Sequence, residues 1–109
     1  VLTETADVIL TPTLPMTAIQ RPVGSDPLGF TDSGLFVQML RYIFVGNLVG
    51  VPGIAIPAGV DSEGLPVSVQ VICLHWHEAD CIDVGRELEK VFAKERTTPP
   101  ASLFVDLLA

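Results

Sequence analysis

Two short runs near the middle of the chain alternate between apolar and small or polar residues. The runs are Gly53–Val60 and Leu65–Ile72, joined by Asp61–Gly64. A period of two is typical of strands with one face in a core, and Asp first and Gly fourth in the joint favour a type I turn. The pattern therefore predicts a β-hairpin. Pro57 indicates that the first strand is short or lies at a sheet edge, because proline cannot donate to a ladder. The residues expected on the buried face are Ile54, Ile56, Val67, Val69 and Val71.

The most apolar part of the chain precedes the hairpin, and the pattern predicts one helix over Leu35–Val49. Only Gln38, Arg41 and Asn47 are strongly polar in this run, so the helix is apolar on nearly every side. Such a helix needs burial on nearly every side. One further helix and three short strands can scarcely enclose it, so we expect other polypeptide to cover it. The expected caps are Thr31, Asp32 or Ser33 at its start and Gly46 or Gly50 at its end.

The remaining segments predict a few short elements around these two. Asp7–Leu10 is typical of a short strand, and the prolines that follow it force an extended path. The segment 20–34 is rich in Gly, Pro, Ser and Asp and indicates a surface loop. Glu78–Phe92 has helical spacing of apolar residues, with acidic residues in the first turn and lysine near the end. We expect the tail, 93–109, to be an extended arm that docks on another surface.

Composition adds a constraint on completeness. The chain of 109 residues has the size of one domain. Hydrophobic residues make up 49% of it, and with glycine the share is about 57%, above the roughly 45–50% of typical soluble domains. No uninterrupted apolar run reaches the roughly 18 residues of a membrane span. The sequence starts at Val1, without an initiator methionine or a signal-peptide pattern. We interpret these features together as a segment of a larger protein.

Charge argues against two classes of partner. The net charge is −7 and the isoelectric point is about 4.5. The six basic residues form no cluster, so the electrostatic surface that nucleic acid requires is missing from the sequence. An acidic surface also repels anionic lipid headgroups.

Four residues of the types that bind zinc lie close together: Cys73, His75, His77 and Cys81. The spacing contains neither a C-x2-C nor an H-x3-H pair, so a strand-to-helix connector with surface histidines and two small buried thiols is the simpler interpretation. Two cysteines make no disulfide framework, and we expect reduced thiols in an intracellular protein. We predict no metal and no cofactor, and the sequence assigns no role to these four residues.

No serine of this chain has the setting of a catalytic nucleophile, because none lies in a G-x-S-x-G turn. Lys90 and Lys94 lie on a helix face that we expect to be solvated. The sequence also contains no phosphate-binding loop and no dinucleotide fingerprint. We therefore assign no catalytic residue.

Three groups of residues, in this order along the chain, resemble the C-terminal part of amidase-signature hydrolases. The resemblance covers residues 7–92. The groups are the run Asp7–Thr13; Asn47-x-x-Gly50-x-Pro52 with Pro57 and Gly64–Gln70; and Trp76-x-Glu78-Ala79 with the helix after it. The segments that most resemble fatty acid amide hydrolases are Leu40–Tyr42, Gly46–Leu48 and Trp76–Glu78.

The resemblance implies an α/β fold: the C-terminal portion of the amidase-signature fold, a mixed β-sheet with flanking helices, incomplete in this chain. It implies one amidase segment, 1–109, with a family core at 7–92 and a tail at 93–109. Such enzymes hydrolyse C–N amide bonds with a serine, a bridging serine and a neutral lysine, near a Gly/Ser-rich loop. That loop is absent here. The segment is then expected to supply sheet strands and pocket wall, and to be inactive alone.

Position-by-position matching to fatty acid amide hydrolases picks three residues that line the acyl channel, Val37, Leu40 and Phe44. Their spacing of i, i+3 and i+7 places them on one helix face. Trp76 matches another channel-lining position. The alternative is that all four are ordinary core residues. The chain departs from the family pattern at Ser68, Cys73, Leu74 and His75, which puts in doubt the shape near the channel mouth and the subfamily.

The expected function is part of a serine amidase acting on a lipophilic fatty acid amide. One alternative is the glutamine-hydrolysing amidase subunit of an aminoacyl-tRNA amidotransferase, which needs a polar pocket with an anchoring charge. The other is a truncated, non-catalytic interaction module. The expected partners are the remainder of the amidase domain and the amide substrate, with no nucleic acid. A homo-oligomer and peripheral membrane association stay open, and the expected location is intracellular.

Overall fold

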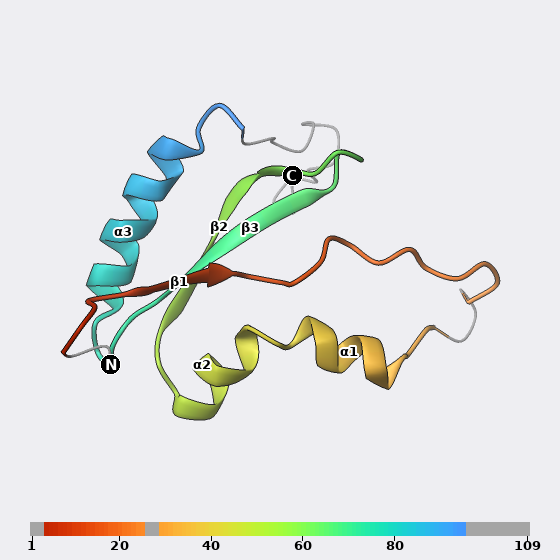
Figure 1. The fold of residues 1–109 in the computed structure, drawn as a ribbon, viewed down its shortest axis with the longest axis horizontal. Helices are drawn as coiled ribbons and strands as arrows, with labels where there is room; N and C mark the ends of the chain where they lie inside the picture. The colour runs from red at the N-terminus through yellow and green to blue at the C-terminus, as the bar shows by residue number, and fades with distance from the viewer. Residues whose placement is uncertain (1–3, 26–28, 96–109) are drawn as a thin grey trace, which may run out of the picture.

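The computed structural model describes residues 4–25 and 29–95 (Figure 1). The described strands form one antiparallel sheet in the order β1-β3-β2, accompanied by three helices, so the α/β class is confirmed. The parallel pair that a mixed sheet requires does not occur in the described part. The elements are β1 (Ile9–Pro12), α1 (Ser33–Met39), α2 (Ile43–Val49), β2 (Gly53–Val60), β3 (Pro66–Ile72) and α3 (Glu78–Val91).

The hairpin of β2 and β3 forms as predicted, with β3 beginning one residue later than expected. Its turn is held by the Asp61 carboxylate, which accepts hydrogen bonds from the N–H groups of Glu63 (2.8 Å) and Leu65 (2.9 Å). Gly64 closes the turn by donating to the Asp61 carbonyl at 3.1 Å, with a φ of +82° that favours glycine. These hydrogen bonds stabilise the charged carboxylate and lower the pKa of Asp61 below its usual 3.8. The bond from the Leu65 N–H has the largest effect.

Prolines occupy positions in the sheet where no N–H donor is needed. Pro57 lies in the outer strand β2, as its chemistry predicts, and Pro66 is the first residue of β3. The strand predicted over Asp7–Leu10 instead runs from Ile9 to Pro12, so the expectation that it ends before Pro12 was wrong. The Thr13 N–H donates to the Ser68 carbonyl at 3.1 Å, and the neighbouring Pro12 therefore points its nitrogen away from β3.

The core lies between the hairpin and α3. Ile56 is 4% exposed and Val71 is fully buried, whereas Val67 and Val69 are half-buried. Gly85 lets the helix approach closely, since a Cβ there would lie 3.1 Å from Cδ1 of Ile56. The predicted inward face of the hairpin is thus the face that α3 covers. Other residues packed against this core are Val8, Ile54, Val84 and Leu88.

The helix predicted over Leu35–Val49 is divided into α1 and α2, which corrects the prediction of one continuous helix. The Arg41 N–H bonds to the Gln38 carbonyl three residues back, at 3.2 Å, and α2 then starts afresh. The apolar spacing runs through this break, so the sequence pattern does not reveal it. Short helices depend on tertiary packing. Neither α1 nor α2 has a buried residue that would keep the two helices on one common axis.

The predicted caps of this region are present. The Asp32 carboxylate accepts from the Leu35 N–H at 2.9 Å and so caps the start of α1. Gly50 ends α2 in the left-handed conformation, with φ of +76°. The two helices are therefore well specified locally, although little of the described chain covers them.

Figure 1 shows α1 and α2 lying away from α3. Phe36 is 58% exposed, Phe44 57% and Leu48 71%. The described residues thus leave the most apolar segment uncovered, in line with the expectation that this chain alone cannot enclose it. None of the described helices has the length and apolar character needed to cross a membrane.

Cys73 and Cys81 form a disulfide, so the expectation of two reduced thiols was wrong. Cys73 follows β3 and Cys81 lies in the first turn of α3, where the chain folds back on itself. Their Cα atoms are 5.9 Å apart, within the range of about 4.4–6.8 Å that a disulfide spans. A count of two cysteines does not show this convergence, because it arises from the reversal of the chain between strand and helix.

Candidate functional site

The structure brings Val37, Leu40 and Phe44 together around one hollow of about 570 Å³. Two polar residues, Gln38 and Arg41, line it as well. Residues 40–42 form the turn between α1 and α2, and the hollow is lined from both sides of this turn. The surface of the hollow is mostly apolar.

The exposure of these side chains bears on whether they are ordinary core residues. Val37 is 68% exposed and Phe44 is 57% exposed, and Leu40 is partly buried. Within the described part of the chain, therefore, none of them packs into the core beneath α3. They form an open apolar surface.

Trp76 lies elsewhere, so the structure does not join it to the other three residues. It borders a separate hollow of about 200 Å³ at the end of α2, with Gly50, Val51, Pro52, His75 and Glu78. The indole is 90% exposed, and the backbone at Trp76 has φ of +67°. A left-handed conformation is uncommon for a residue with a bulky side chain.

The two histidines beside Trp76 have protein partners. His75 Nε2 is 3.0 Å from the Val49 carbonyl oxygen, and His77 Nδ1 is 2.6 Å from Oδ2 of Asp80. The neighbouring cysteine sulfurs are bonded to each other. Across residues 4–25 and 29–95, no three His, Cys, Asp or Glu side chains gather in a way that could hold a metal.

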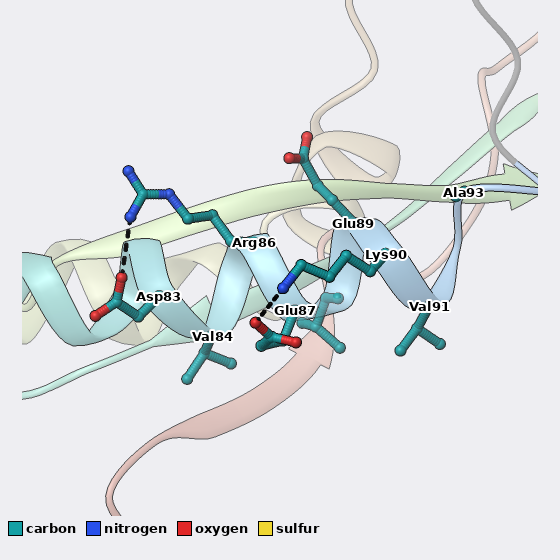
Figure 2. A pocket seen from close by; sticks show the side chains of 9 residues that line it. Asp83, Val84, Arg86, Glu87, Glu89, Lys90, Val91 and Ala93 are labelled. Carbon is teal, nitrogen blue, oxygen red and sulfur yellow. Dashed lines mark hydrogen bonds and ion pairs between the residues drawn. The ribbon is translucent and has the colours of Figure 1, made fainter.

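A larger hollow, of about 880 Å³, runs along α3 (Figure 2). Its sides carry two ion pairs, Asp83 with Arg86 at 3.1 Å and Glu87 with Lys90 at 2.6 Å. The Lys90 side chain is 70% exposed. A serine amidase needs a lysine that is buried and neutral, so the solvated, ion-paired Lys90 is not suited to that role.

Two residues of the apolar hollow, Gln38 and Arg41, escaped the sequence analysis. Arg41 is four residues after Val37, a spacing that places both on one side of a helix, whereas Gln38 directly follows Val37 and does not share that face. The spacing therefore contained a signal for Arg41 and none for Gln38. Neither was taken as a site residue, because the family resemblance implied an apolar channel wall.

Comparisons with known proteins point to one family. The Amidase family model matches residues 1–82. The chain is 38% identical over 102 residues to a fatty acid amide hydrolase from Oryza sativa subsp. indica, and 34% identical over 92 residues to a glutamyl-tRNA(Gln) amidotransferase subunit from Roseobacter denitrificans. These alignments cover 94% and 83% of this chain, but only 16% and 17% of the relatives.

A solved structure shows the same fold. It is that of 6-aminohexanoate cyclic dimer hydrolase complexed with substrate, with a TM-score of 0.66 and 26% sequence identity. The match covers 86% of this chain and 21% of the other. Family model, relatives and fold agree, and the chain belongs to the Amidase family.

Proposed function

We propose that this chain is part of an amidase that hydrolyses the C–N bond of lipophilic fatty acid amides. The chain contributes sheet strands and a section of the acyl-pocket wall, and the reacting serine is outside it. The observation that carries the proposal is the hollow of about 570 Å³ lined by Val37, Leu40 and Phe44. The 38% identity to a fatty acid amide hydrolase supports it.

The wall acts by burying the acyl chain of the substrate. Each methylene transferred from water to such a surface contributes about 0.8 kcal/mol, or about fourfold in kcat/KM if the contact persists in the transition state. The exposed Phe44 ring and the neighbouring Leu40 supply this surface. Chain length of the substrate is therefore the property that this segment selects.

The chemistry itself is assigned to the remainder of the amidase domain, which is the proposed partner of this chain. Acyl transfer to serine requires a nucleophile and a neutral base, and we assign neither to residues 1–109. Within the chain, residues 7–92 are the proposed family core. The proposed docking tail is 93–109, and its residues 96–109 lie outside the described part of the chain. The match covers 16% of the fatty acid amide hydrolase, which leaves most of that protein's length for this machinery.

The test uses full-length protein that contains this chain, a series of fatty acid amides of increasing length, and two matched phenylalanines. Phe44 and Phe36 have nearly equal exposure, 57% and 58%, but only Phe44 lines the hollow. We expect Phe44→Ala to flatten the dependence of kcat/KM on chain length and Phe36→Ala to leave it unchanged. Equal effects of the two substitutions, or no hydrolysis by the parent protein, would contradict the proposal.

A second candidate is glutamine hydrolysis, and Arg41 favours it. Arg41 lines the same hollow, and a guanidinium has the charge and fork geometry that bind a carboxylate. The amidotransferase relative from Roseobacter denitrificans supports this candidate. If glutamine is the substrate, Arg41→Ala raises KM for glutamine by about tenfold or more. If fatty acid amides are the substrates, the same change has a small effect on them and glutamine is not hydrolysed.

A further inference from the structure

A disulfide closes the connection between β3 and α3 at its base. Cys73 is fully buried and Cys81 is 3% exposed, and both lie in the core beside Val71. Between them, residues 74–77 form the exposed loop that carries Trp76. The link therefore joins the sheet to the helix at a buried point directly beneath this loop.

Trp76 is held in an unfavourable conformation on that loop. Its φ is +67°, and it is the one non-glycine residue with positive φ among the described residues. The cost arises from the Cβ, which approaches the following carbonyl. Such a conformation persists only when its surroundings determine it. The indole is 90% exposed, so packing of the ring does not hold it. The constraints on the loop are its covalent closure, the hydrogen bond from the His77 N–H to the Leu74 carbonyl at 3.1 Å, and the contact of His75 Nε2 with the Val49 carbonyl oxygen at 3.0 Å.

The loop is also aligned with the end of α2. His75 Nε2 lies 3.0 Å from the carbonyl oxygen of Val49, the last residue of α2. Trp76 and Gly50 border the same small hollow. The position of the indole is thus set relative to the helix that carries Phe44.

We propose that the Cys73–Cys81 disulfide is a redox-sensitive latch that holds Trp76 in its left-handed conformation beside the end of α2. A dithiol reductant opens it: one thiolate attacks a cysteine sulfur and breaks the S–S bond, and the second thiolate resolves the mixed disulfide. The reductant leaves as a cyclic disulfide. Two electrons and two protons pass to Cys73 and Cys81, which become thiols.

The surroundings support the thiol state as well as the disulfide. Sγ of Cys81 lies 3.8 Å from the carbonyl oxygens of Pro52 and Val71, which can accept from a thiol. The Cys73 N–H donates to the Pro52 carbonyl at 3.1 Å, so the backbone there stays fixed without the link. Reduction therefore removes the covalent closure of residues 74–77 and leaves the hairpin in place.

The first experiment follows Trp76 directly, since it is the only tryptophan of the chain. The chain is isolated without reductant, its thiols are counted by alkylation and mass spectrometry, and its fluorescence is recorded before reduction with dithiothreitol and after reoxidation. We expect no free thiol at the start. On reduction we expect a reversible blue shift with less acrylamide quenching, because the released indole packs on the apolar surface at the end of α2. The circular dichroism should stay unchanged.

The second experiment needs no change to the cysteines. Asparagine tolerates the left-handed conformation and phenylalanine does not, so Trp76→Asn and Trp76→Phe differ in the strain that the latch holds. In a glutathione redox buffer, the disulfide of Trp76→Asn should be favoured over that of Trp76→Phe by about threefold to fivefold, corresponding to roughly 1 kcal/mol of left-handed strain.

Three results would overturn the latch: free thiols in the chain isolated without reductant, emission that does not respond to reduction, or equal disulfide stability in the two Trp76 variants. Loss of the circular dichroism signal on reduction would overturn it as well, because the disulfide would then be needed for folding. None of these readouts depends on amide hydrolysis, so the latch and the proposed function are tested separately.

Discussion

The hairpin with α3 and the pair α1–α2 are both strongly apolar, yet only the first buries its apolar face. Ile56 is 4% exposed and Val71 is fully buried, because α3 covers them. On α2, by contrast, Phe44 is 57% exposed and Leu48 71% exposed. Hydrophobic character therefore does not distinguish the two regions. What distinguishes them is cover: α3 covers the hairpin, whereas the described residues leave much of α1 and α2 exposed.

This difference separates residues that stabilise the chain from residues available to a partner or a substrate. Removing apolar surface from water is the main favourable contribution to folding, and α1 and α2 contribute little of it within the described residues. Their apolar side chains keep that free energy available for binding. The proposed acyl-pocket wall and the docking of the remaining domain both use it.

The largest expected effect is on the free energy of unfolding, and it is seen by truncating two aliphatic residues of equal size, one in each region. Ile56→Ala leaves a cavity beneath α3 and should lower the free energy of unfolding by about 2–4 kcal/mol. Leu48→Ala, at a position that is 71% exposed, should change it by no more than about 0.5 kcal/mol. Urea unfolding followed by circular dichroism measures both. Equal losses would mean that α2 is packed in solution and that the contrast between the two regions is wrong.

The sequence predicted the first region well because its partners are local. Alternation placed Ile54, Ile56 and Val71 on one face, and the Asp61–Gly64 joint specified the turn. For the second region it predicted the caps, Asp32 and Gly50, and the lack of cover. It missed the break near Arg41, since apolar spacing continues through it and no tertiary contact marks the position.

The candidate site was less predictable than the fold. The spacing of Val37, Leu40 and Phe44 indicated a common face, and these residues do line one hollow. Trp76 was grouped with them through the family resemblance alone, and the structure places it at another hollow. The disulfide was missed because pairing of Cys73 with Cys81 depends on how tightly the chain reverses between β3 and α3, which spacing does not encode.

Substitution of one helical glycine in each region should change the stability of the chain in opposite directions. At Gly85, a Cβ would lie 3.1 Å from Cδ1 of Ile56, so Gly85→Val should overpack the core and destabilise the chain by about 1–3 kcal/mol. At Gly46 on α2 a Cβ would meet no atom within 4 Å, and Gly46→Ala should stabilise by about 0.4–1 kcal/mol. Thermal unfolding of the two variants gives the signs directly. A stabilised Gly85→Val would show that α3 does not pack closely on the hairpin.

The smallest effect compares two aspartates that accept hydrogen bonds from backbone N–H groups, Asp61 in the hairpin turn and Asp32 at the start of α1. The N–H groups of Leu65 and Glu63 lower the folded-state pKa of Asp61 below 3.8. The unfolded chain then binds more protons than the folded chain in the interval between the two pKa values. The stability that this carboxylate contributes is therefore complete above pH 3.8 and is lost as the pH falls through the folded-state pKa.

Asp61→Asn should abolish that component, so the variant loses less stability than the parent chain as the pH falls below 3.8. Asp32→Asn serves as the control, because it changes a capping carboxylate on a helix with no buried residue. Urea midpoints measured along this acid range report the difference between each variant and the parent. If both substitutions flatten the pH dependence equally, the hairpin turn contributes no more to global stability than the cap of α1. The contrast between the hairpin with α3 and the pair α1–α2 would then be wrong.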